Sequence, residues 1–405
     1  MKIAMVSEHA SPLASLGSVD AGGQNVHVAA LAQALTDLGN SVTVFTRRDD
    51  PNLPETVVMP SGVIVRHVHA GPARRIAKDA IYPHVRELSR GLQRAWRFDR
   101  PDVVHSHFWM SGIAAIDAAA VFGLPTVHTY HALGVEKLRH QGAADTSPPV
   151  RICEEAKIAR RVDCIVATSR AELLELQDMG ERPRSICVIP CGVDVVRFSP
   201  FGDREPKNSG RFRVVSVSRL VPRKGVDTVI ESIASVPDAE LVVAGGGETG
   251  RLEDDFEARR LRTLASKRGV SQRVSLRGPI ERERVAELLR SADAVVCTPW
   301  YEPFGIVALE AMSCAVPVIA SCVGGLSDTV IDGVTGFHVA PRSPEQVSEA
   351  LRRLQGDAGM RREFGRAARE RAVAHYTWSE VARETLKVYR LSIDGKVQQR
   401  FAIVS

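Results

Sequence analysis

Short runs of apolar residues alternate with helical patterns from the start of the chain. A strand-like run at 3–7 precedes a helical pattern at 24–38, in which Val28, Leu31 and Leu35 share one face. Further strand-like runs in the first half lie at 41–46, 63–69, 102–107, 126–131, 164–169 and 186–190. Strands that alternate with helices in this way indicate βαβ units and a parallel sheet.

A stretch rich in proline, glycine and charge interrupts this alternation at 198–211. We therefore predict a first domain at 1–197, a linker at 198–211 and a second domain at 212–376. The second domain repeats the pattern, with strand-like runs at 212–219, 240–245, 274–277, 293–299 and 317–321. Ligands of doubly wound sheets bind beyond the carboxyl ends of the strands, so two such domains that face each other predict a site in the cleft between them.

The composition changes this picture little, since 405 residues with 44% hydrophobic and 25% charged residues describe a two-domain globular protein. No apolar run reaches the roughly 20 residues of a membrane span, and the start lacks a signal-peptide core, so no transmembrane segment is expected. Seven scattered cysteines favour a cytoplasmic location. The net charge of +5 is not concentrated in one tract, which argues against nucleic acid as a partner and leaves anionic small molecules. No pattern indicates an oligomeric state.

The segment 300–311 follows directly on a strand-like run, and it carries Glu302 and Glu310 eight residues apart. The helix that it opens would present three backbone amides to a ligand, those of Phe304, Gly305 and Ile306. A helix N-terminus favours phosphate or a developing negative charge, and the two carboxylates can accept hydrogen bonds from ligand hydroxyls. The alternative is a pair of surface carboxylates on a helix.

A loop with two basic residues follows the first strand of the second domain. Arg219 and Lys224 lie in the run 216–225, where fixed cations can bind a diphosphate and stabilise it as a leaving group. A solvated pair of cations is the alternative. After the run at 274–277, Pro279 and Ile280 are placed to meet a nucleotide base through backbone groups.

The first domain has a glycine-rich turn between its first strand and first helix, at 20–27. Gly22 and Gly23 let the backbone approach a ligand closely, and Gln24 and Asn25 present amides at the start of the helix. A plain glycine-rich turn explains the same residues.

Histidines gather at the ends of the next strand-like runs. His105 and His107 fall on one face of a strand, and His128 and His131 lie in and after the following one. Such a group also suits a metal ion. No carboxylate partner is nearby, however, and Asp-x-Asp does not occur, so no metal site is expected.

Taken together, these segments resemble glycosyltransferase family 4. The resemblance runs from residue 1 to about residue 390. It is carried by the Gly-Gly-Gln turn, the basic loop, the two glutamates and the histidine segments 104–112 and 128–134. Within the family the chain is similar to the sucrose-phosphate synthase branch and to the inositol-phosphate N-acetylglucosaminyltransferase branch of the mycothiol pathway.

This resemblance implies a GT-B fold of two Rossmann-like domains and an enzyme of the hexosyltransferase class. Family members retain the anomeric configuration and need neither metal nor cofactor. They transfer a hexosyl group from a nucleoside-diphosphate sugar, here with UDP favoured, to a small polar acceptor. The resemblance also implies that the helix at 377–391 crosses back to the first domain, in agreement with its apolar stripe, and it leaves the tail at 392–405 unassigned.

The resemblance further implies roles for single residues on the donor side. Glu310 matches the acid that binds the ribose, and Glu302 the acid that holds donor-sugar hydroxyls together with the amides at 304–306. Arg219 and Lys224 match the cations that bind the diphosphate. Gly23, next to Gly22, matches the glycine packed on the donor phosphate, and His131 matches the histidine beside the donor sugar.

On the acceptor side, Lys78 and Arg151 match basic positions that hold an acceptor phosphate in the inositol-phosphate branch, near Gln24, Asn25 and His107. The tyrosine and threonine that share this phosphate in that branch are replaced by Phe108 and Ala132, which cannot donate a side-chain hydrogen bond. The resemblance therefore favours a phosphorylated or otherwise polar sugar acceptor other than inositol 3-phosphate.

Other functions fit parts of the sequence. Gly245, Gly247 and Gly250 have the spacing of a dinucleotide-binding loop, but Arg277 stands where a dehydrogenase would place an acidic residue. A sugar-nucleotide epimerase or a non-catalytic sugar-nucleotide-binding protein would share the fold and the donor. Phosphorylase-like chemistry lacks a clear lysine context for pyridoxal phosphate.

Overall fold

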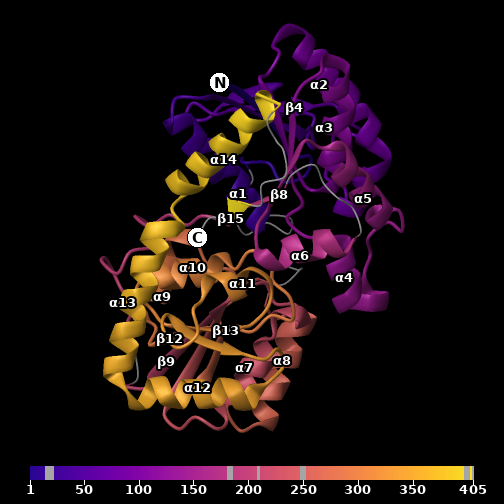
Figure 1. The fold of residues 1–405 in the computed structure, drawn as a ribbon. Helices are drawn as coiled ribbons and strands as arrows, with labels where there is room; N and C mark the ends of the chain where they lie inside the picture. Colours follow the sequence, from indigo (N-terminus) through magenta and orange to yellow (C-terminus); the bar gives the residue numbers. More distant parts are fainter. Residues whose placement is uncertain (14–21, 180–185, 208–209, 247–251, 396–401, 404–405) are drawn as a thin grey trace. The chain divides into compact units, whose positions relative to one another are not determined.

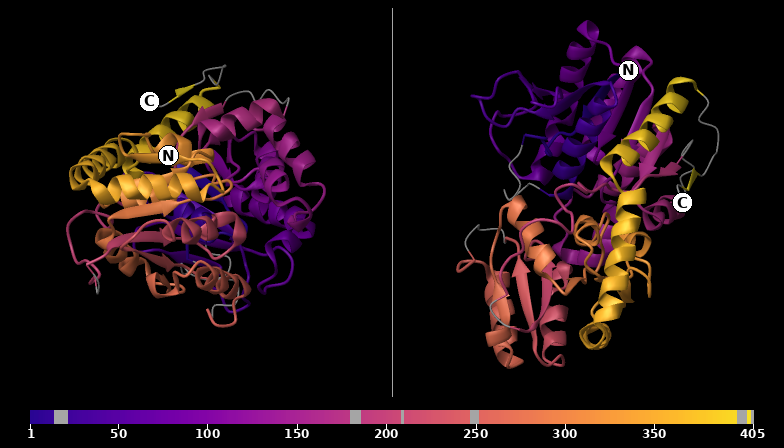
Figure 2. Two further views of the ribbon diagram at one scale, coloured as in Figure 1. Left: turned by 90° about the horizontal axis from the view of Figure 1, so that it is seen from below. Right: turned by 90° about the vertical axis from the view of Figure 1, so that its left-hand side faces the viewer.

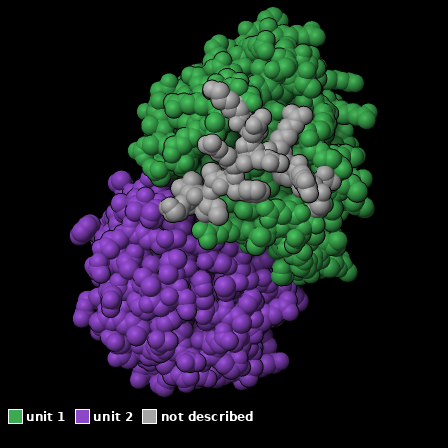
Figure 3. All heavy atoms as spheres, viewed as in Figure 1, with its two compact units in different colours: residues 1–191, 378–405 green, residues 192–377 purple. Residues whose placement is uncertain are grey.

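The computed structural model describes residues 1–13, 22–179, 186–207, 210–246, 252–395 and 402–403. The chain forms two compact units, which Figure 3 shows in different colours. Unit 1 comprises Met1–Cys191 and Trp378–Ser405, and unit 2 comprises Gly192–Thr377.

The unit boundary lies earlier in the chain than the predicted linker at 198–211. Phe198 is fully buried in the core of unit 2, and its carbonyl accepts a hydrogen bond of 2.6 Å from the hydroxyl of Ser313. The described part of the expected linker therefore belongs to unit 2, because a buried aromatic side chain anchors it there. Asn208 and Ser209 lie outside the described residues.

Unit 1 contains a nine-stranded sheet with the order β15-β8-β7-β6-β5-β1-β2-β4-β3, in which only the β3–β4 pair is antiparallel. Its strands are β1 Lys2–Val6, β2 Ser41–Arg47, β3 Thr56–Val58, β4 Ile64–Val68, β5 Val103–His107, β6 Thr126–Thr129, β7 Cys164–Ala167, β8 Ile186–Val188 and β15 Ala402–Ile403. Its helices are α1 Gly23–Asp37, η1 Lys78–His84, α2 Val85–Phe98, α3 Trp109–Phe122, α4 Gly134–Gln141, η2 Gly142–Ala144, α5 Arg151–Arg161, α6 Arg170–Asp178 and α14 Trp378–Ile393.

Helices cover both faces of this sheet (Figure 1). Alternate residues of β1 divide between two cores: Ala4 and Val6 pack with helices α2 and α3, while Ile3 and Met5 pack with α1 and α14. In α14 the buried positions include Val381, Leu386 and Tyr389. The last helix of the described residues thus completes the core of unit 1, and the right-hand view of Figure 2 shows it beside that unit.

Unit 2 contains a six-stranded parallel sheet with the order β11-β10-β9-β12-β13-β14. Its strands are β9 Phe212–Val217, β10 Ala239–Ala244, β11 Val274–Leu276, β12 Ala294–Cys297, β13 Val318–Ser321 and β14 Gly336–Val339. Its helices are η3 Pro222–Lys224, α7 Val226–Ile233, α8 Phe256–Lys267, η4 Ser271–Arg273, α9 Arg282–Ser291, α10 Ile306–Ser313, α11 Gly324–Thr329, α12 Pro344–Gly356 and α13 Ala358–His375.

Both sheets contain the strand order of a doubly wound dinucleotide-binding fold. The direction of the winding reverses between β1 and β5 in unit 1 and between β9 and β12 in unit 2. Ligands of such sheets bind at the carboxyl ends of the strands where this reversal occurs. Each unit therefore has one edge at which a site is expected. Among the described helices, none is long and apolar enough to cross a membrane.

Candidate functional site

In unit 2 the loops after β9 and β12 touch each other at the reversal point. Gly225 has a φ of +68°, and a Cβ atom there would lie 1.9 Å from the carbonyl oxygen of Thr298. The hydroxyl of Thr298 donates a 2.9 Å hydrogen bond to the carbonyl of Gly225. Only glycine permits this approach, which brings Lys224 to the end of β12.

Lys224 and Glu302 form an ion pair through Nζ and Oε2, and both side chains are largely buried. Burial acts to raise the pKa of Glu302, but Lys224, Arg223 and the amide of Gly305 outweigh it and hold this pKa below its usual value. Glu302 is therefore a carboxylate that can accept hydrogen bonds from hydroxyls. The structure brings these two predicted residues into direct contact.

The backbone around Glu302 is held by a pair of glycines at the start of α11. The amide of Gly325 donates to the carbonyl of Glu302 at 2.9 Å, and a Cβ on Gly324 would lie 2.1 Å from the same oxygen. Gly305 has a φ of +75° and precedes α10, which begins at Ile306. The loop containing Phe304 is thereby packed between β12, α10 and α11.

Glu310 lies within α10, further along the chain than Glu302, and is 4% exposed. Burial raises the pKa of Glu310 to about 7, although Arg282 and Arg197 act to lower it. Nη2 of Arg282 donates to Oε1 at 2.9 Å. Arg282, at the start of α9, was not predicted; its position just after the Pro279–Ile280 loop was the signal available in the sequence.

The remaining predicted residues of unit 2 lie on the same edge. Arg219 is exposed directly after β9. Pro279 and Ile280 follow β11, and a Cβ on Gly246 would lie 2.9 Å from the ring of Pro279. The glycines after β10 therefore let the loop after β11 lie close to the end of β10. Gly247 and Gly250, from the dinucleotide-like spacing, lie outside the described residues.

In unit 1 the turn before α1 is held by its own side chains. Asn25 is buried; its Oδ1 accepts from the amide of Gly22 at 3.1 Å, and its Nδ2 donates to the carbonyl of Ser11 at 3.1 Å. Gln24 Nε2 donates to Ser7 Oγ at 3.2 Å and to the carbonyl of His107 at 3.4 Å. Gly23 is the first residue of α1. The side chain of Asn25 is thus engaged in shaping the turn, and its contact with an acceptor stays a prediction. Asp20 and Ala21 lie outside the described residues.

Four buried histidines from α1, β5 and the β6 loop gather beside this turn. His107 and His131 share a hydrogen bond of 2.9 Å, and the rings of His105 and His107 lie 4.2 Å apart. The rings of His27 and His131 are 5.0 Å apart. Burial lowers the pKa of His27 to about 4 and holds the pKa values of the other three well below the usual range. These imidazoles are therefore neutral near pH 7.

The histidine group is not arranged around an ion. His105 is bonded to the hydroxyl of Tyr389 at 2.7 Å and to Thr129 Oγ1 at 3.0 Å. The described part of the chain contains no group of three or more histidine, cysteine or carboxylate side chains able to hold a metal ion.

Two residues of this edge adopt the left-handed backbone conformation that side chains disfavour. Phe108, after β5, has a φ of +78°, and His131, after β6, has a φ of +64°. Such conformations cost about 1–3 kcal/mol each and often occur at functional sites. The amide of Phe108 donates to the carbonyl of Thr129 at 2.9 Å, which ties the two strand ends together.

Lys78 and Arg151 meet on the ring of Phe108, with their charged groups 5.1 and 5.0 Å from its centroid. Arg151 is 2% exposed and donates from Nε to Glu155 at 2.8 Å and from Nη2 to the carbonyl of Ala132 at 2.5 Å. Lys78 forms no ion pair among the described residues. Burial, with Lys137 and Arg151 nearby, lowers the pKa of Lys78 to about 8, although Asp79 and Glu8 oppose the shift. The structure thus brings the two predicted cations to one aromatic ring, and their contact with an acceptor phosphate stays a prediction.

Three polar residues at this edge were not predicted. Glu8 and His9 follow β1 directly, and their position at a strand end was a sequence signal. Glu155, on α5, accepts from the amide of Gly134 at 2.8 Å as well as from Arg151. It joins the His131 loop to the cation site, which only the packing of α5 reveals.

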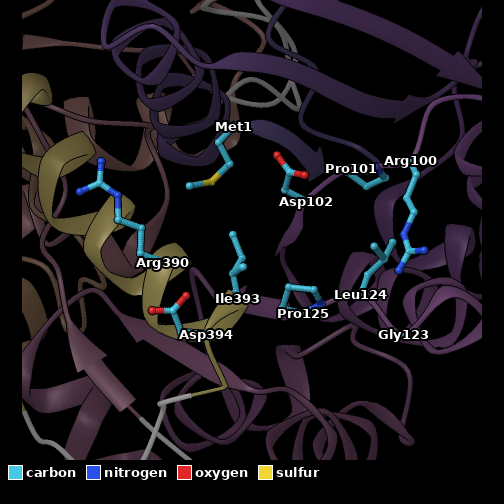
Figure 4. Close-up of a pocket in the computed structure, with 10 residues that line it drawn as sticks. All are labelled: Met1, Arg100, Pro101, Asp102, Gly123, Leu124, Pro125, Arg390, Ile393 and Asp394. Atoms are coloured by element: carbon cyan, nitrogen blue, oxygen red, sulfur yellow. The ribbon is translucent and has the colours of Figure 1, made fainter.

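A cavity of about 680 Å³ lies on the opposite edge of the unit 1 sheet (Figure 4). It is lined by residues that precede β5 and β6, including Asp102 and Pro125, and by Arg390, Ile393 and Asp394 at the end of α14. It faces the amino ends of the strands and is separate from the residues described above.

The strand order of both units agrees with a GT-B glycosyltransferase, and comparison with known proteins shows that the chain is one. Residues 21–197 match the family model "Glycosyltransferase Family 4", and residues 201–371 match "Glycosyl transferases group 1". A D-inositol 3-phosphate glycosyltransferase of Kribbella flavida is 35% identical over 97% of this chain and 96% of its own length. The chain belongs to glycosyltransferase family 4, and it is an enzyme.

Solved structures show the same fold. A sucrose-phosphate synthase from Thermosynechococcus elongatus is 31% identical and superimposes with a TM-score of 0.89 over 97% of this chain and 99% of that one. The Anabaena protein HepE in complex with UDP and glucose is 19% identical, with a TM-score of 0.75 over 96% of this chain and 99% of its own, and shares the fold.

Proposed function

We propose that this enzyme transfers a hexosyl group, with retention and without a metal ion, from a nucleoside-diphosphate sugar to a small phosphorylated sugar. UDP is the favoured nucleotide. The part of this proposal that concerns the donor rests on the contact of Lys224 with Glu302 at the reversal point of unit 2. An acid and a base that neutralise each other at a strand end can exchange this contact for sugar hydroxyls and phosphate.

On this proposal each residue of the unit 2 edge has a part in donor binding. Lys224 and Arg219 bind the diphosphate, and Glu302 accepts hydrogen bonds from sugar hydroxyls beside the amides of Phe304, Gly305 and Ile306. Glu310 binds the ribose, and Pro279 and Ile280 meet the base. The bond of Glu310 to Arg282 supports a role in orienting hydroxyls.

The transfer proceeds at the face of the sugar that the leaving group occupies. The bond from the anomeric carbon to the phosphate oxygen breaks, the bond to the acceptor oxygen forms, and the acceptor proton passes to the phosphate. For His131 and Gly23 we infer the roles that the family resemblance implies, contact with the donor sugar and with the donor phosphate. Cations of the protein supply the stabilisation of the leaving diphosphate that a metal ion supplies elsewhere.

On the acceptor side, Lys78 and Arg151 hold a phosphate group. A partly buried lysine without an ion pair among the described residues, next to a buried arginine, favours a dianion. Both cations lie over the ring of Phe108, which offers no hydrogen bond, and the carbonyl of Ala132 already accepts from Arg151. This arrangement supports an acceptor other than inositol 3-phosphate, such as a ketose or aldose phosphate.

The test is a panel of nucleotide sugars crossed with sugar phosphates and inositol phosphates, with each product identified by mass. We expect a glycosylated product with a UDP-hexose and one sugar phosphate, at equal rates with and without EDTA, and with the donor's anomeric configuration by NMR. Release of an epimerised nucleotide sugar in the absence of acceptor would contradict this proposal and favour an epimerase. Donor binding without turnover would contradict it and favour a non-catalytic sugar-nucleotide-binding protein.

A further inference from the structure

His107, the last residue of β5, has a fully buried side chain that contacts a residue of the proposed site. Its Nδ1 is 2.9 Å from Nε2 of His131, and the two rings are stacked with their centroids 5.1 Å apart. The function proposed for this enzyme gives His131 a contact with the donor sugar. Because the His107 side chain has no exposed surface, it can affect the reaction through His131 and not by binding a substrate itself.

His107 also packs against His105, which lies two residues earlier on the same face of β5. The rings of these two histidines are 4.2 Å apart. Nδ1 of His105 is 2.7 Å from the hydroxyl of Tyr389 on α14, and its Nε2 is 3.0 Å from Oγ1 of Thr129. Both ring nitrogens of His105 are therefore engaged, which holds this ring in one orientation and gives His107 a rigid surface to pack on.

Burial keeps both imidazoles of the His107–His131 pair neutral near pH 7 by lowering their pKa values, so each ring carries one proton. Nε2 of His107 is buried and forms no hydrogen bond with any described residue. A proton on this atom would leave a buried N–H group without an acceptor, an arrangement that is rare in proteins. We therefore place the proton of His107 on Nδ1, from which it is donated to Nε2 of His131. The proton of His131 must then lie on Nδ1.

The ring of His131 is held by its backbone and by two neighbouring imidazoles. The residue has a φ of +64°, a left-handed conformation that side chains disfavour and that often occurs at functional sites. Its ring stands nearly perpendicular to that of His27, at 79° and with the centroids 5.0 Å apart. The ring of His107 stacks on it at 27°. These contacts fix the plane of the His131 ring and with it the direction of its Nδ1–H group.

We propose that His107 is a positioning residue, which keeps the proton of His131 on Nδ1 and directs this Nδ1–H group to an oxygen of the donor sugar. This inference rests on the proposed function and deepens it, since it states which atom of His131 acts and which residue holds it. A hydrogen bond from a fixed direction accelerates the reaction when it is best aligned in the transition state. Loss of the alignment should therefore lower turnover and leave the binding of the nucleotide unchanged.

The position of the proton can be measured without any substrate. Nitrogen-15 NMR of the enzyme with labelled histidine distinguishes a protonated Nδ1 from a protonated Nε2, and the His131 signals are assigned by their loss in His131→Ala. We expect the wild type to carry the His131 proton on Nδ1, and His107→Leu to show a mixture of the two tautomers. A His131 proton on Nε2 in the wild type would overturn the inference.

The kinetic experiment compares His107→Leu with His107→Asn, using UDP-glucose as donor and fructose 6-phosphate as acceptor, or the pair that the panel identifies in their place. The amide of asparagine can donate a hydrogen bond where Nδ1 of histidine does, whereas leucine only fills the space. We expect kcat to fall about tenfold in His107→Leu, with unchanged UDP affinity, and to recover in part in His107→Asn. In the His131→Ala background, His107→Leu should cause no further loss. A packing role would instead make leucine the better replacement, in thermal stability and in kcat alike.

His128 on β6 provides a matched control, since it is a second fully buried imidazole, with Nδ1 2.8 Å from Oγ of Ser106 and with no described partner for Nε2. His128→Leu and His128→Asn should not differ in kcat in the way expected at position 107. Wild-type kcat in His107→Leu, or equal losses in His107→Leu and His107→Asn, overturns the positioning role, and a loss in Lys224→Ala then leaves the proposed function intact. If the wild type forms no glycosylated product with any pair of the panel, the proposed function fails, and the contact of His131 with a donor sugar fails with it.

Discussion

In unit 2 each acid of the candidate site contacts a base, Glu302 with Lys224 and Glu310 with Arg282. In unit 1 the comparable edge pairs Arg151 with Glu155 but leaves Lys78 without an ion pair among the described residues, and its buried imidazoles are neutral. Both edges lie at the reversal point of the same strand order. On the proposed function, the fold places a ligand at the reversal point of each unit, whereas the local balance of charge favours a different ligand in each.

This difference has a physical consequence for binding. An acid and a base that neutralise each other cost less free energy to bury than a single charge does. They can exchange their mutual contact for a ligand that brings both hydroxyls and phosphate. A partly buried lysine without an ion pair loses solvation of its charge and gains more from binding an anion than a paired lysine does. We therefore expect substitutions in unit 2 to reduce turnover with any acceptor, and substitutions in unit 1 to change which acceptor is used.

The largest effect is expected from the cations of unit 2. Lys224→Ala and Arg219→Ala should each lower turnover by about 100-fold, because each removes a preorganised charge from the leaving diphosphate. Steady-state rates with saturating substrates measure the loss. Lys207→Ala, which removes a lysine paired to Asp293 at 2.6 Å elsewhere in unit 2, is the control and should leave turnover unchanged. Wild-type turnover in the double variant at 219 and 224 would refute the assignment.

The next effect concerns the acceptor in unit 1. Phe108→Tyr and Ala132→Thr restore two hydrogen-bond donors, and each should tighten inositol 3-phosphate binding by about 1.5–3 kcal/mol. Calorimetric titration with inositol 3-phosphate measures the gain, and Phe98→Tyr at an exposed position of α2 serves as the control. Efficient transfer to inositol 3-phosphate by the unaltered enzyme would show instead that the two missing donors do not matter.

A smaller effect is expected from pH. Because the pKa of Lys78 is lowered to about 8, the side chain is a cation at pH 7 and is mostly neutral at pH 9. The acceptor kcat/KM, which reports ionisations of the free enzyme, should therefore fall about tenfold between these two values. Lys78→Arg keeps the charge at both pH values and should remove this fall. A fall of the same size in Lys78→Arg would assign it to another group.

For Glu302 we expect no covalent product. Glu302 is held by Lys224 and the amide of Gly305, an arrangement that suits a binder of hydroxyls and not a covalent nucleophile. Intact-protein mass spectrometry after incubation with a 2-fluoro nucleotide sugar should show no added sugar. A glycosyl ester on Glu302 would require a double-displacement mechanism.

The pattern of apolar residues was sufficient to predict the α/β class and most strands of both sheets, because strands buried on two faces form apolar runs that helical segments separate. The structure differs at short or edge strands. β3 at Thr56–Val58 and β14 at Gly336–Val339 were not predicted, since an edge strand of three or four residues has too little apolar sequence to stand out.

The sequence alone determined which residues end the strands, and strand ends of a doubly wound sheet are where ligands bind. Glu302 and Lys224 could therefore be named before any coordinates, whereas Lys78 and Arg151, which begin helices and do not end strands, were named only through the family resemblance. Tertiary structure alone decided which of them touch, and what charge they carry there. The contact of Lys224 with Glu302 depends on Gly225 lying against Thr298, far along the chain, and the lowered pKa of Lys78 depends on burial by separate helices and loops. Contact and burial are properties of packing between distant segments, so local sequence patterns do not contain them.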